Sequence, residues 1–299
     1  MCCYEKSVVA VVVTYNRKEL LKTAIEKIMG QSWKECDILI VDNGSTDGTD
    51  KLIYDQFSFE RVRYYNTGEN LGGAGGFEFG VKKATELGYD YIWMMDDDTW
   101  PESDALKALL QADALLGGEW GFLSSVAYWT DGSICKMNIQ KKNIFRHVTA
   151  RDYNYEVSKI QMCSFVSLLV KAEIVKEIGL PIGEYFIWTD DYEFTGRISK
   201  NYQSYMVPSS KVVHNMEKHS RVVFSTESPS RMNRYHYIYR NDVHCYRQYG
   251  IIGWIYIVLK VIYTVMDILL RSKGNKINKI KIVLQGIKEG LSFNPQIHF

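Results

Sequence analysis

Short apolar runs alternate with helical patterns along the N-terminal part of the chain. Residues 7–14 (SVVAVVVT) form a continuous β-branched run, which is typical of a central strand in a parallel sheet. Apolar side chains then recur at three- and four-residue spacing from Leu20 to Ile28, and Gly30 marks the end of this predicted helix. Three more strands are predicted, with helical segments between them, at residues 36–42, 62–65 and 91–95. Strands that alternate with helices predict βαβ units and a parallel sheet.

The rest of the sequence extends this α/β pattern and then becomes helical. The spacing of apolar positions predicts helices at residues 105–116 and 171–178 and strands at 121–128, 161–170 and 204–213. The last strand is expected to break at Pro208. Residues 136–156 are polar, basic and irregular, which favours a loop or hairpin over the site. Ser228 and Pro229 are residue types that begin a helix, and a long helical region follows them.

Three adjacent carboxylates, Asp96, Asp97 and Asp98, follow the apolar run YIWMM. Such carboxylates at the end of a buried strand repel one another and are costly to desolvate, so a cation is expected beside them. Hard carboxylate oxygens suit Mg²⁺ or Mn²⁺. Open α/β sheets also bind their ligands at the carboxyl ends of strands. The alternative for an isolated run of this kind is a solvated turn.

The composition is that of an ordinary globular protein of 299 residues, with 46% apolar and 24% charged side chains. A formal net charge of +1 argues against a general nucleic-acid-binding protein. The six cysteines have no regular spacing, which favours reduced thiols in a cytosolic chain. No secretory signal is expected, because the first apolar run is short and ends in TYNRK. Cys2 and Cys3 are candidates for reversible palmitoylation.

A glycine-rich stretch, NLGGAGGF, joins the third predicted strand to the next helix, which is expected from Phe77. Such a loop can place backbone N–H groups against a phosphate. The alternative is a loop whose glycines allow close packing. The stretch is neither G-x-G-x-x-G nor a Walker A loop, so neither of these nucleotide-binding fingerprints is present.

Four motifs that occur in order, TYNRKELL, VDNGSTDGT, NLGGAGGF and MDDD, resemble those of the family 2 inverting glycosyltransferases. The LGGAGGF segment is most similar to the galactofuranosyltransferase and rhamnosyltransferase branches. The resemblance covers the larger, N-terminal part of the chain. It implies the GT-A fold, a Rossmann-like nucleotide-sugar-binding α/β fold with a mixed, mostly parallel sheet, here followed by a C-terminal helical extension.

The resemblance also implies a donor-binding role for residues at the ends of the strands. The positions that match are Thr14, Arg17, Asp42, Asn70, Gly72 and Gly73. Asp42 would accept a hydrogen bond from the ring N–H of uracil or thymine. Asn70 and the glycines after it would let the diphosphate and the base lie close to the backbone.

The same resemblance assigns the three aspartates. Asp96 would bind the ribose of the donor, and Asp97 would support the site or face the donor sugar. Asp98 would bind a divalent ion, Mn²⁺ or Mg²⁺, that bridges the two phosphates. This assignment agrees with the chemistry, because a nucleoside diphosphate gains negative charge as the glycosidic bond breaks and a divalent ion offsets that charge.

A second acidic cluster lies within GEYFIWTDDYEFTGR, at residues 183–197. Displacing a diphosphate by a sugar hydroxyl needs a base that takes the hydroxyl proton, and a carboxylate between aromatic side chains can have its pKa raised for that task. The cluster resembles the family's ED-x-D/E motif, in which Asp191 is the base, Asp190 binds the acceptor and Trp188 stacks on a sugar. The alternative is a helix N-terminus with Thr189 as its N-cap.

One histidine follows the predicted strand that contains Pro208. A single histidine at such a place is most often structural. The galactofuranosyltransferase-like members have a metal-binding histidine after the base motif, which implies His214 as a ligand beside Asp98. Carboxylate, imidazole and phosphate ligands are compatible with Mn²⁺. His219 is the rival candidate.

The segment RYHYIYRN, at residues 234–241, resembles a Tyr-rich segment of the rhamnosyl- and galactofuranosyl-transferring members. It could close over the donor phosphates through Arg234 or Arg240. The alternative is a packing helix with a solvated basic face.

Residues 251–270 are long and apolar enough to be tested as a membrane span. Lys260 and Asp267 fall within the segment and share one helix face, and each would cost about 2.5–3.5 kcal/mol in the bilayer centre. An amphipathic helix that lies in the membrane interface is therefore expected, followed by a second, basic amphipathic helix suited to an anionic leaflet. The alternative is a dimer interface through the same apolar faces.

These features predict a catalytic GT-A domain at residues 1–225 and a helical region at 226–299 that contacts the membrane surface or a second copy. The predicted activity is transfer of galactofuranose from UDP-galactofuranose to a lipid-linked precursor of a cell-surface polysaccharide, at the inner face of the cell membrane. One alternative is a deoxythymidine diphosphate-rhamnose donor, because the shared motifs do not choose the sugar. Another is a non-catalytic nucleotide-sugar-binding subunit of a glycan-assembly complex, against which the intact Asp191 argues.

Overall fold

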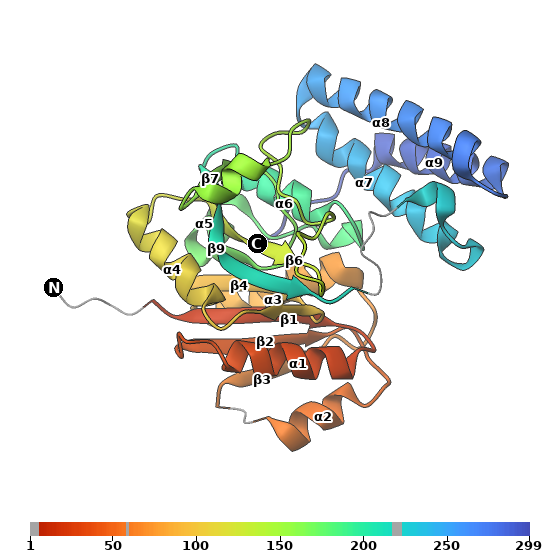
Figure 1. Ribbon diagram of the computed structural model, residues 1–299. Helices are drawn as coiled ribbons and strands as arrows, with labels where there is room; N and C mark the ends of the chain where they lie inside the picture. Colours follow the sequence, from red (N-terminus) through yellow and green to blue (C-terminus); the bar gives the residue numbers. More distant parts are fainter. Residues whose placement is uncertain (1–5, 58–59, 217–222) are drawn as a thin grey trace.

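The computed structural model describes residues 6–57, 60–216 and 223–299 (Figure 1). The strands are β1 (Val8–Thr14), β2 (Cys36–Asp42), β3 (Val62–Asn66), β4 (Tyr91–Asp96), β5 (Thr99–Pro101), β6 (Phe122–Tyr128), β7 (Ser158–Ile160), β8 (Leu168–Lys171) and β9 (Ser204–His214). The α-helices are α1 (Lys18–Met29), α2 (Thr49–Gln56), α3 (Gly72–Glu86), α4 (Ala105–Leu115), α5 (Ala172–Ile178), α6 (Asp190–Ile198), α7 (Tyr235–Arg247), α8 (Gly250–Arg271) and α9 (Lys276–Ser292).

Within the described residues one sheet of nine strands has the order β3-β2-β1-β4-β8-β6-β9-β5, and β7 pairs with β9. Strands β3, β2, β1 and β4 are parallel, whereas β8 joins β4 in the antiparallel sense. Alternate residues of β1 face opposite layers. One layer contains α1 and α4, and the other contains α3 and α5. The predicted mixed, mostly parallel α/β sheet is confirmed.

The parallel pairing brings the polar ends of three strands to one edge of the sheet. Thr14 at the end of β1 pairs with Asp42 of β2, and Val13 pairs with Asp96 of β4. The strands before these positions are buried because their side chains are β-branched or aromatic and are covered on both faces. The polar ends therefore meet where an open α/β sheet binds ligands.

The prediction of one strand over residues 161–170 is wrong. Only β8 is extended there, and it begins at Leu168. Ser167 has a left-handed φ of +63°, which interrupts an extended chain. The Ser167 hydroxyl is buried and accepts a hydrogen bond from the indole N–H of Trp93. Residues 161–167 thus pack as an irregular segment with an internal polar contact.

Strand β9 continues through Pro208, contrary to the expected break. Its register against β6 shifts between Ser125, which pairs with Val207, and Val126, which pairs with Lys211. Residues 208–210 form a bulge, where a proline does not interrupt the ladder of hydrogen bonds. The strand then reaches His214, which pairs with Thr99 of the short strand β5.

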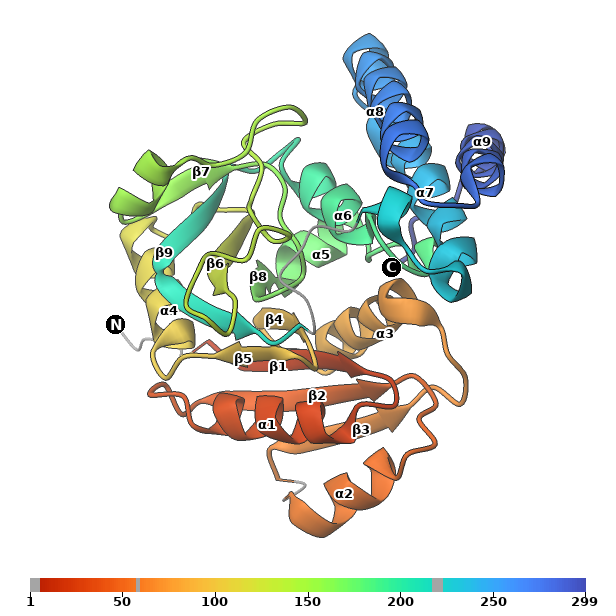
Figure 2. The same cartoon turned by 45° about the vertical axis from the view of Figure 1, so that its right-hand side comes forward.

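The C-terminal helices α7, α8 and α9 lie together at one corner of the molecule, beside α6 and away from β1, β2 and β3 (Figures 1 and 2). The predicted helix start at Ser228 and Pro229 is a 3₁₀ helix, η4 (Pro229–Arg234), that leads into α7. Helix α9 can pack closely on α7 because Gly286 and Gly290 have no side chain. A Cβ at these positions would lie only 2.6 Å and 2.7 Å from the α7 backbone. Four cysteines, Cys36, Cys135, Cys163 and Cys245, are free and buried, and Cys2 and Cys3 lie outside the described residues.

Candidate active site

A cavity of about 520 Å³ opens at the polar edge of the sheet, between the ends of β1 and β4, the start of α3 and the loop before α6. Among its lining residues are Thr14, Arg17, Asn70, Gly72, Gly73, Asp96 and Asp97. The structure therefore brings together all but one of the positions for which the resemblance implies donor contacts. Their role in binding a donor stays a prediction.

Asp42 is the position that does not line this cavity. Its side chain is fully buried, and its two carboxylate oxygens already accept hydrogen bonds. Tyr64 donates to Oδ2 at 2.6 Å, and the backbone N–H of Ser45 donates to Oδ1 at 2.8 Å. These contacts give Asp42 a structural role in the turn after β2, and its contact with a nucleobase remains a prediction.

The glycines of the NLGGAGGF stretch serve two purposes. Gly72 has a φ of +73°, and a Cβ there would lie 2.0 Å from the carbonyl oxygen of Phe186, so only glycine fits beside the loop before α6. Gly76 and Gly80 instead allow α3 to approach Val13 and Val11 of β1. Close packing thus accounts for these two glycines, and α3 begins at Gly72 rather than at the predicted Phe77.

Two of the three adjacent aspartates, Asp97 and Asp98, form ion pairs with a cation from the chain itself. The Arg17 guanidinium lies 3.3 Å from Oδ1 of Asp97 and 3.1 Å from Oδ2 of Asp98. Thr14 donates a hydrogen bond of 2.7 Å to Asp97. Burial nevertheless raises the pKa of Asp97 to about 6, since Arg17 offsets only part of the desolvation and Asp98 adds repulsion.

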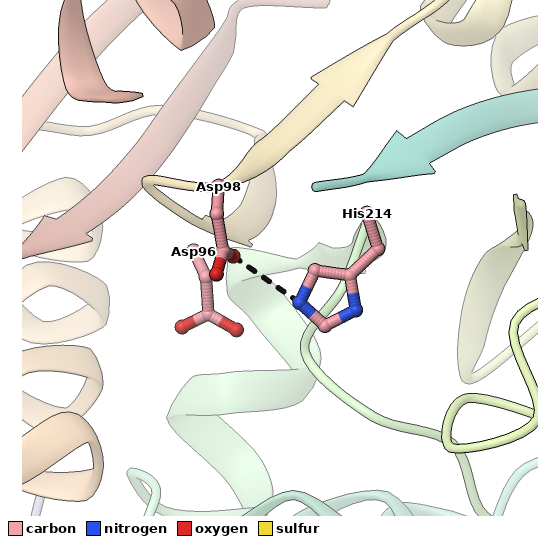
Figure 3. Close-up of side chains that lie close together, drawn as sticks. All are labelled: Asp96, Asp98 and His214. Carbon is pink, nitrogen blue, oxygen red and sulfur yellow. Dashed lines mark ion pairs between the residues drawn. The ribbon is translucent and has the colours of Figure 1, made fainter. Parts of the chain in front are cut away.

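Asp96, Asp98 and His214 form a group whose ligand atoms all lie within 4.8 Å of one another (Figure 3). The antiparallel pairing of β5 with β9 places His214 beside the aspartates. Its Nε2 lies 3.2 Å from Oδ1 of Asp98. Burial opposes a charge on the imidazole, but the hydrogen bond to Asp98 and the charges of Asp98 and Asp96 outweigh it and raise the pKa of His214 to about 10.

This donor set fits a divalent ion. Two carboxylates and one imidazole offer oxygen and nitrogen ligands of the kind that Mn²⁺ and Mg²⁺ accept. The other ring nitrogen of His214, Nδ1, is 2.8 Å from Oδ1 of Asn138, and this bond orients Nε2 toward the carboxylates. The structure adds Asp96 as a candidate ligand, a residue expected to bind ribose. His219, the rival candidate, lies outside the described residues.

Asn138 is a site residue that sequence reasoning missed. It lies in the irregular segment between β6 and β7, where a single asparagine has no distinguishing neighbours. Its Oδ1 accepts from His214 and from the Cys135 thiol at 2.9 Å, and its amide donates to Ser164 at 2.8 Å. Only the folded chain shows that this predicted loop supports the histidine.

Asp190 and Asp191 lie in the first turn of α6. Burial raises the pKa of Asp191 to about 7, and the negative charge of Asp96 adds to this effect. Burial and the adjacent Asp191 likewise raise the pKa of Asp190. Burial and the charge of Asp98 raise the pKa of Asp96, and the charge of Asp190 adds a smaller contribution. The two acidic clusters are therefore close enough to influence each other's ionisation.

The alternative of a helix N-terminus is confirmed in part, because α6 begins at Asp190 and Thr189 stands at its N-cap position, but the Thr189 side chain does not cap the helix. Thr189 has a left-handed φ of +69° and makes no capping hydrogen bond. Its hydroxyl instead donates to Oδ1 of Asp242 at 3.1 Å. Trp188 packs against Tyr235, with ring centroids 5.1 Å apart, so its stacking on an acceptor sugar stays a prediction.

The two arginines of the Tyr-rich segment have different surroundings. Arg234 lines the cavity. Arg240 is not a lining residue: its guanidinium donates to the carbonyl oxygens of Glu184 at 2.7 Å and Tyr185 at 3.2 Å and lies 4.0 Å from the ring centroid of Phe293. Packing is thus the role of Arg240, and only Arg234 is placed to face a donor.

Known sequences are similar to this chain over its larger part. Residues 9–115 match the family described as Glycosyl transferase family 2. Galactofuranosyltransferase GlfT1 of Mycolicibacterium smegmatis is 28% identical over 200 residues, which span 65% of this chain and 66% of the relative, just under two thirds of its length. Glycosyltransferase GlyA of Streptococcus pneumoniae serotype 4 is 22% identical over 189 residues, or 60% of this chain and 26% of the relative.

Solved structures share the fold at low sequence identity. A structure of GalNAc-T7 with UDP, GalNAc and Mn²⁺ has a TM-score of 0.59 at 12% identity and covers 94% of this chain and 55% of that chain. Residues 1–349 of TarS from S. aureus give a TM-score of 0.53 at 14% identity and cover 96% of this chain and 72% of that one. The chain therefore has the GT-A fold of known glycosyltransferases, its residues 9–115 match Glycosyl transferase family 2, and galactofuranosyltransferases are among its sequence relatives.

Proposed function

We propose that this glycosyltransferase transfers galactofuranose, with inversion, from UDP-galactofuranose to a lipid-linked precursor of a cell-surface polysaccharide. The observation that carries the proposal is the presence of two buried acidic clusters, at the end of β4 and in the first turn of α6, whose charges influence each other. Asp191 has its pKa raised to about 7, partly by the charge of Asp96 from the other cluster. The similarity to galactofuranosyltransferases such as GlfT1 supports galactofuranose as the sugar.

The donor side of the cavity suits a nucleoside diphosphate. Arg17 and Arg234 bring two guanidinium groups to its lining, and guanidinium groups bind phosphate oxygens strongly. The absence of a side chain at Gly73, where a Cβ would meet no atom within 4 Å, lets a ligand approach the backbone. A divalent ion, Mn²⁺ or Mg²⁺, bound by Asp96, Asp98 and His214 would offset the charge of the departing diphosphate.

Asp191 would accept the proton of the acceptor hydroxyl. A base works best when its pKa is close to the working pH, and burial brings Asp191 to that range. In an inverting transfer the hydroxyl attacks from the face opposite the leaving diphosphate, so the base and the diphosphate site belong on different sides of the sugar. Asp190, on the same turn, would orient the acceptor.

A donor screen tests this function. Purified protein with Mn²⁺ and an octyl galactofuranoside acceptor is expected to release UDP from UDP-galactofuranose at least tenfold faster than it releases nucleoside diphosphate from UDP-galactose, UDP-glucose or dTDP-rhamnose. Preferred turnover of dTDP-rhamnose would contradict the proposed sugar. No turnover of any donor would favour a non-catalytic sugar-nucleotide-binding subunit.

We further propose that residues 226–299 attach the protein to an anionic membrane surface. By length and composition alone, α8 could cross a membrane. However, Lys260 turns inward to an ion pair with Asp242 of α7, and Asp267 pairs with Arg271. The opposite face of α8 exposes apolar side chains, namely Ile251, Ile252, Ile255, Val258, Leu259, Ile262, Tyr263, Met266, Leu269 and Leu270. Lys273, Lys276 and Lys281 follow as exposed cations, so a helix lying in the interface is favoured.

A double variant of this face, Ile255→Glu and Leu259→Glu together, is expected to bind phosphatidylglycerol vesicles at least tenfold more weakly, because two charges would enter the apolar layer. Co-sedimentation measures this binding. Leu115→Glu is the matched control, since Leu115 is 57% exposed on α4. Equal binding by the double variant would contradict the proposal. If the unaltered protein bound no vesicles, and the double variant were a monomer where the unaltered protein is a dimer, the face would instead join two copies.

A further inference from the structure

Residues 184–189, here named the 184–189 loop, connect the cavity to the predicted base. Phe186 and Ile187 line the cavity, and α6 begins with Asp190 directly after the loop. The loop is strained: Phe186, Trp188 and Thr189 have φ values of +64°, +65° and +69°. Side chains with a Cβ rarely adopt this region, and a β-branched residue such as Thr189 does so least. A loop of this kind persists only where its surroundings hold it.

Three consecutive residues of α7 hold the loop. Arg240 donates to the carbonyl oxygens of Glu184 and Tyr185. The Nδ2 amide of Asn241 donates to three carbonyl oxygens, those of Tyr185 at 3.0 Å, Ile187 at 3.0 Å and Trp188 at 2.9 Å. Asp242 accepts from the Thr189 hydroxyl at 3.1 Å, and its other oxygen pairs with Lys260.

Asn241 is the central member of this set. Its side chain is fully buried, and its Oδ1 accepts a 3.0 Å hydrogen bond from Nε of Arg240, which fixes the orientation of the amide. Two N–H bonds serve three carbonyl oxygens, so at least one hydrogen is shared. The backbone on both sides of the strained Phe186 thus depends on one side chain. On its other side the loop contacts α3, where Phe186 accepts from the N–H of Ala74 at 3.2 Å.

We propose that Asn241 is a positioning residue for sugar transfer: through the 184–189 loop it sets where α6 begins and thereby where the Asp191 carboxylate stands relative to the donor cavity. Asn241 is not among the residues that line the donor cavity. This inference rests on the proposed function, because it needs Asp191 to be the base. The carbonyl oxygens that Asn241 binds belong to Tyr185, Ile187 and Trp188, all within the loop, so loss of the amide would release the loop and leave the sheet intact.

Asn241→Ala and the nearly isosteric Asn241→Asp test the proposal. Both remove the N–H donors, and both are expected to raise amide hydrogen exchange in residues 184–191 while exchange in β1 and β4 stays unchanged. UDP affinity is expected to stay within about threefold, and the rate of UDP release from UDP-galactofuranose per UDP-binding site to fall at least tenfold. Val243→Ala is the matched control, because Val243 is equally buried on α7 but packs on Gly290 of α9.

The outcomes separate the possibilities. Faster exchange in the loop with a selective loss of turnover, absent from Val243→Ala at a similar melting temperature, supports the positioning role. Unchanged exchange, unchanged turnover per UDP-binding site, or an equal loss in Val243→Ala would overturn it. No turnover of any donor by the unaltered protein would instead overturn the proposed function and the role of Asn241 in transfer, while the exchange data would still decide whether Asn241 orders the loop.

Discussion

Asp191→Asn is expected to lower the rate of sugar transfer by about 10²- to 10⁴-fold while UDP binding stays nearly unchanged. Asparagine has almost the same shape as aspartate but cannot accept the proton of the acceptor hydroxyl. The backbone contacts of Asp191, in which Thr195 donates to its carbonyl oxygen at 2.6 Å, do not require the carboxylate. Transfer rates at saturating donor, together with calorimetric UDP binding, measure the two effects separately.

Glu193→Gln is the matched control for this variant. Glu193 is another buried carboxylate of α6, but it pairs with Arg197 at 2.9 Å rather than facing the other acidic cluster. The control is expected to lose stability and to keep its transfer rate per folded molecule. If Asp191→Asn turned over at the rate of the unaltered protein, the assignment of the base would be wrong.

The pH dependence of the unaltered protein checks the same residue. A general base acts in its ionised form, so kcat is expected to rise with pH as Asp191 loses its proton. Burial raises that pKa most, and the charge of Asp96 raises it further, to about 7 rather than the usual value for aspartate. The inflection is therefore expected near neutral pH. An inflection near pH 4, as for an exposed aspartate, would contradict a buried base.

Removal of divalent ions is expected to lower the transfer rate by at least about 10²-fold, since charge stabilisation by a bound ion is worth several kcal/mol. EDTA treatment followed by addition of Mn²⁺ measures the loss and the recovery. Asp98→Asn is expected to prevent recovery at ordinary Mn²⁺ concentrations, because it removes one of the ligand atoms of the Asp96, Asp98 and His214 group.

Asn138→Ala is a milder change at the same metal site than Asp98→Asn. It removes the partner that orients the His214 ring and leaves the three ligands in place. Loss of such a partner is expected to weaken Mn²⁺ binding by about 10- to 100-fold, with the transfer rate recovered at saturating Mn²⁺. Full activity in EDTA would contradict a metal-assisted reaction altogether.

The parts of the fold that the sequence predicts are those with a strong local pattern. The β-branched run that forms β1 and the apolar run before Asp96 are buried parallel strands, because side chains covered on both faces must all be apolar. The carboxylates at the strand ends could be identified for the same reason, since they interrupt such runs. The parallel register then brings them to one edge without any further information.

The features that the sequence does not predict depend on contacts distant along the chain. Strand β5 has three residues, too few for any periodicity, and exists because it pairs with β9. That pairing brings His214 to the aspartates, and Asn138 reaches the histidine from an irregular segment. The left-handed φ of Thr189 goes against the preference of a β-branched residue, and its hydroxyl bonds to Asp242 of α7 rather than capping α6.

The orientation of the charged side chains of α8 bears on the topology of the protein. The length and average hydropathy of α8 are those of a helix that crosses a bilayer. If α8 crossed, the residues before it and the residues after it would lie in different compartments. Lys260, however, is committed to Asp242 on the inner side of the helix. Under the proposed attachment, a bilayer that meets only the outer, apolar side would leave both ends of α8 in one aqueous phase, and the sugar-transfer site and the C-terminal residues would share a compartment.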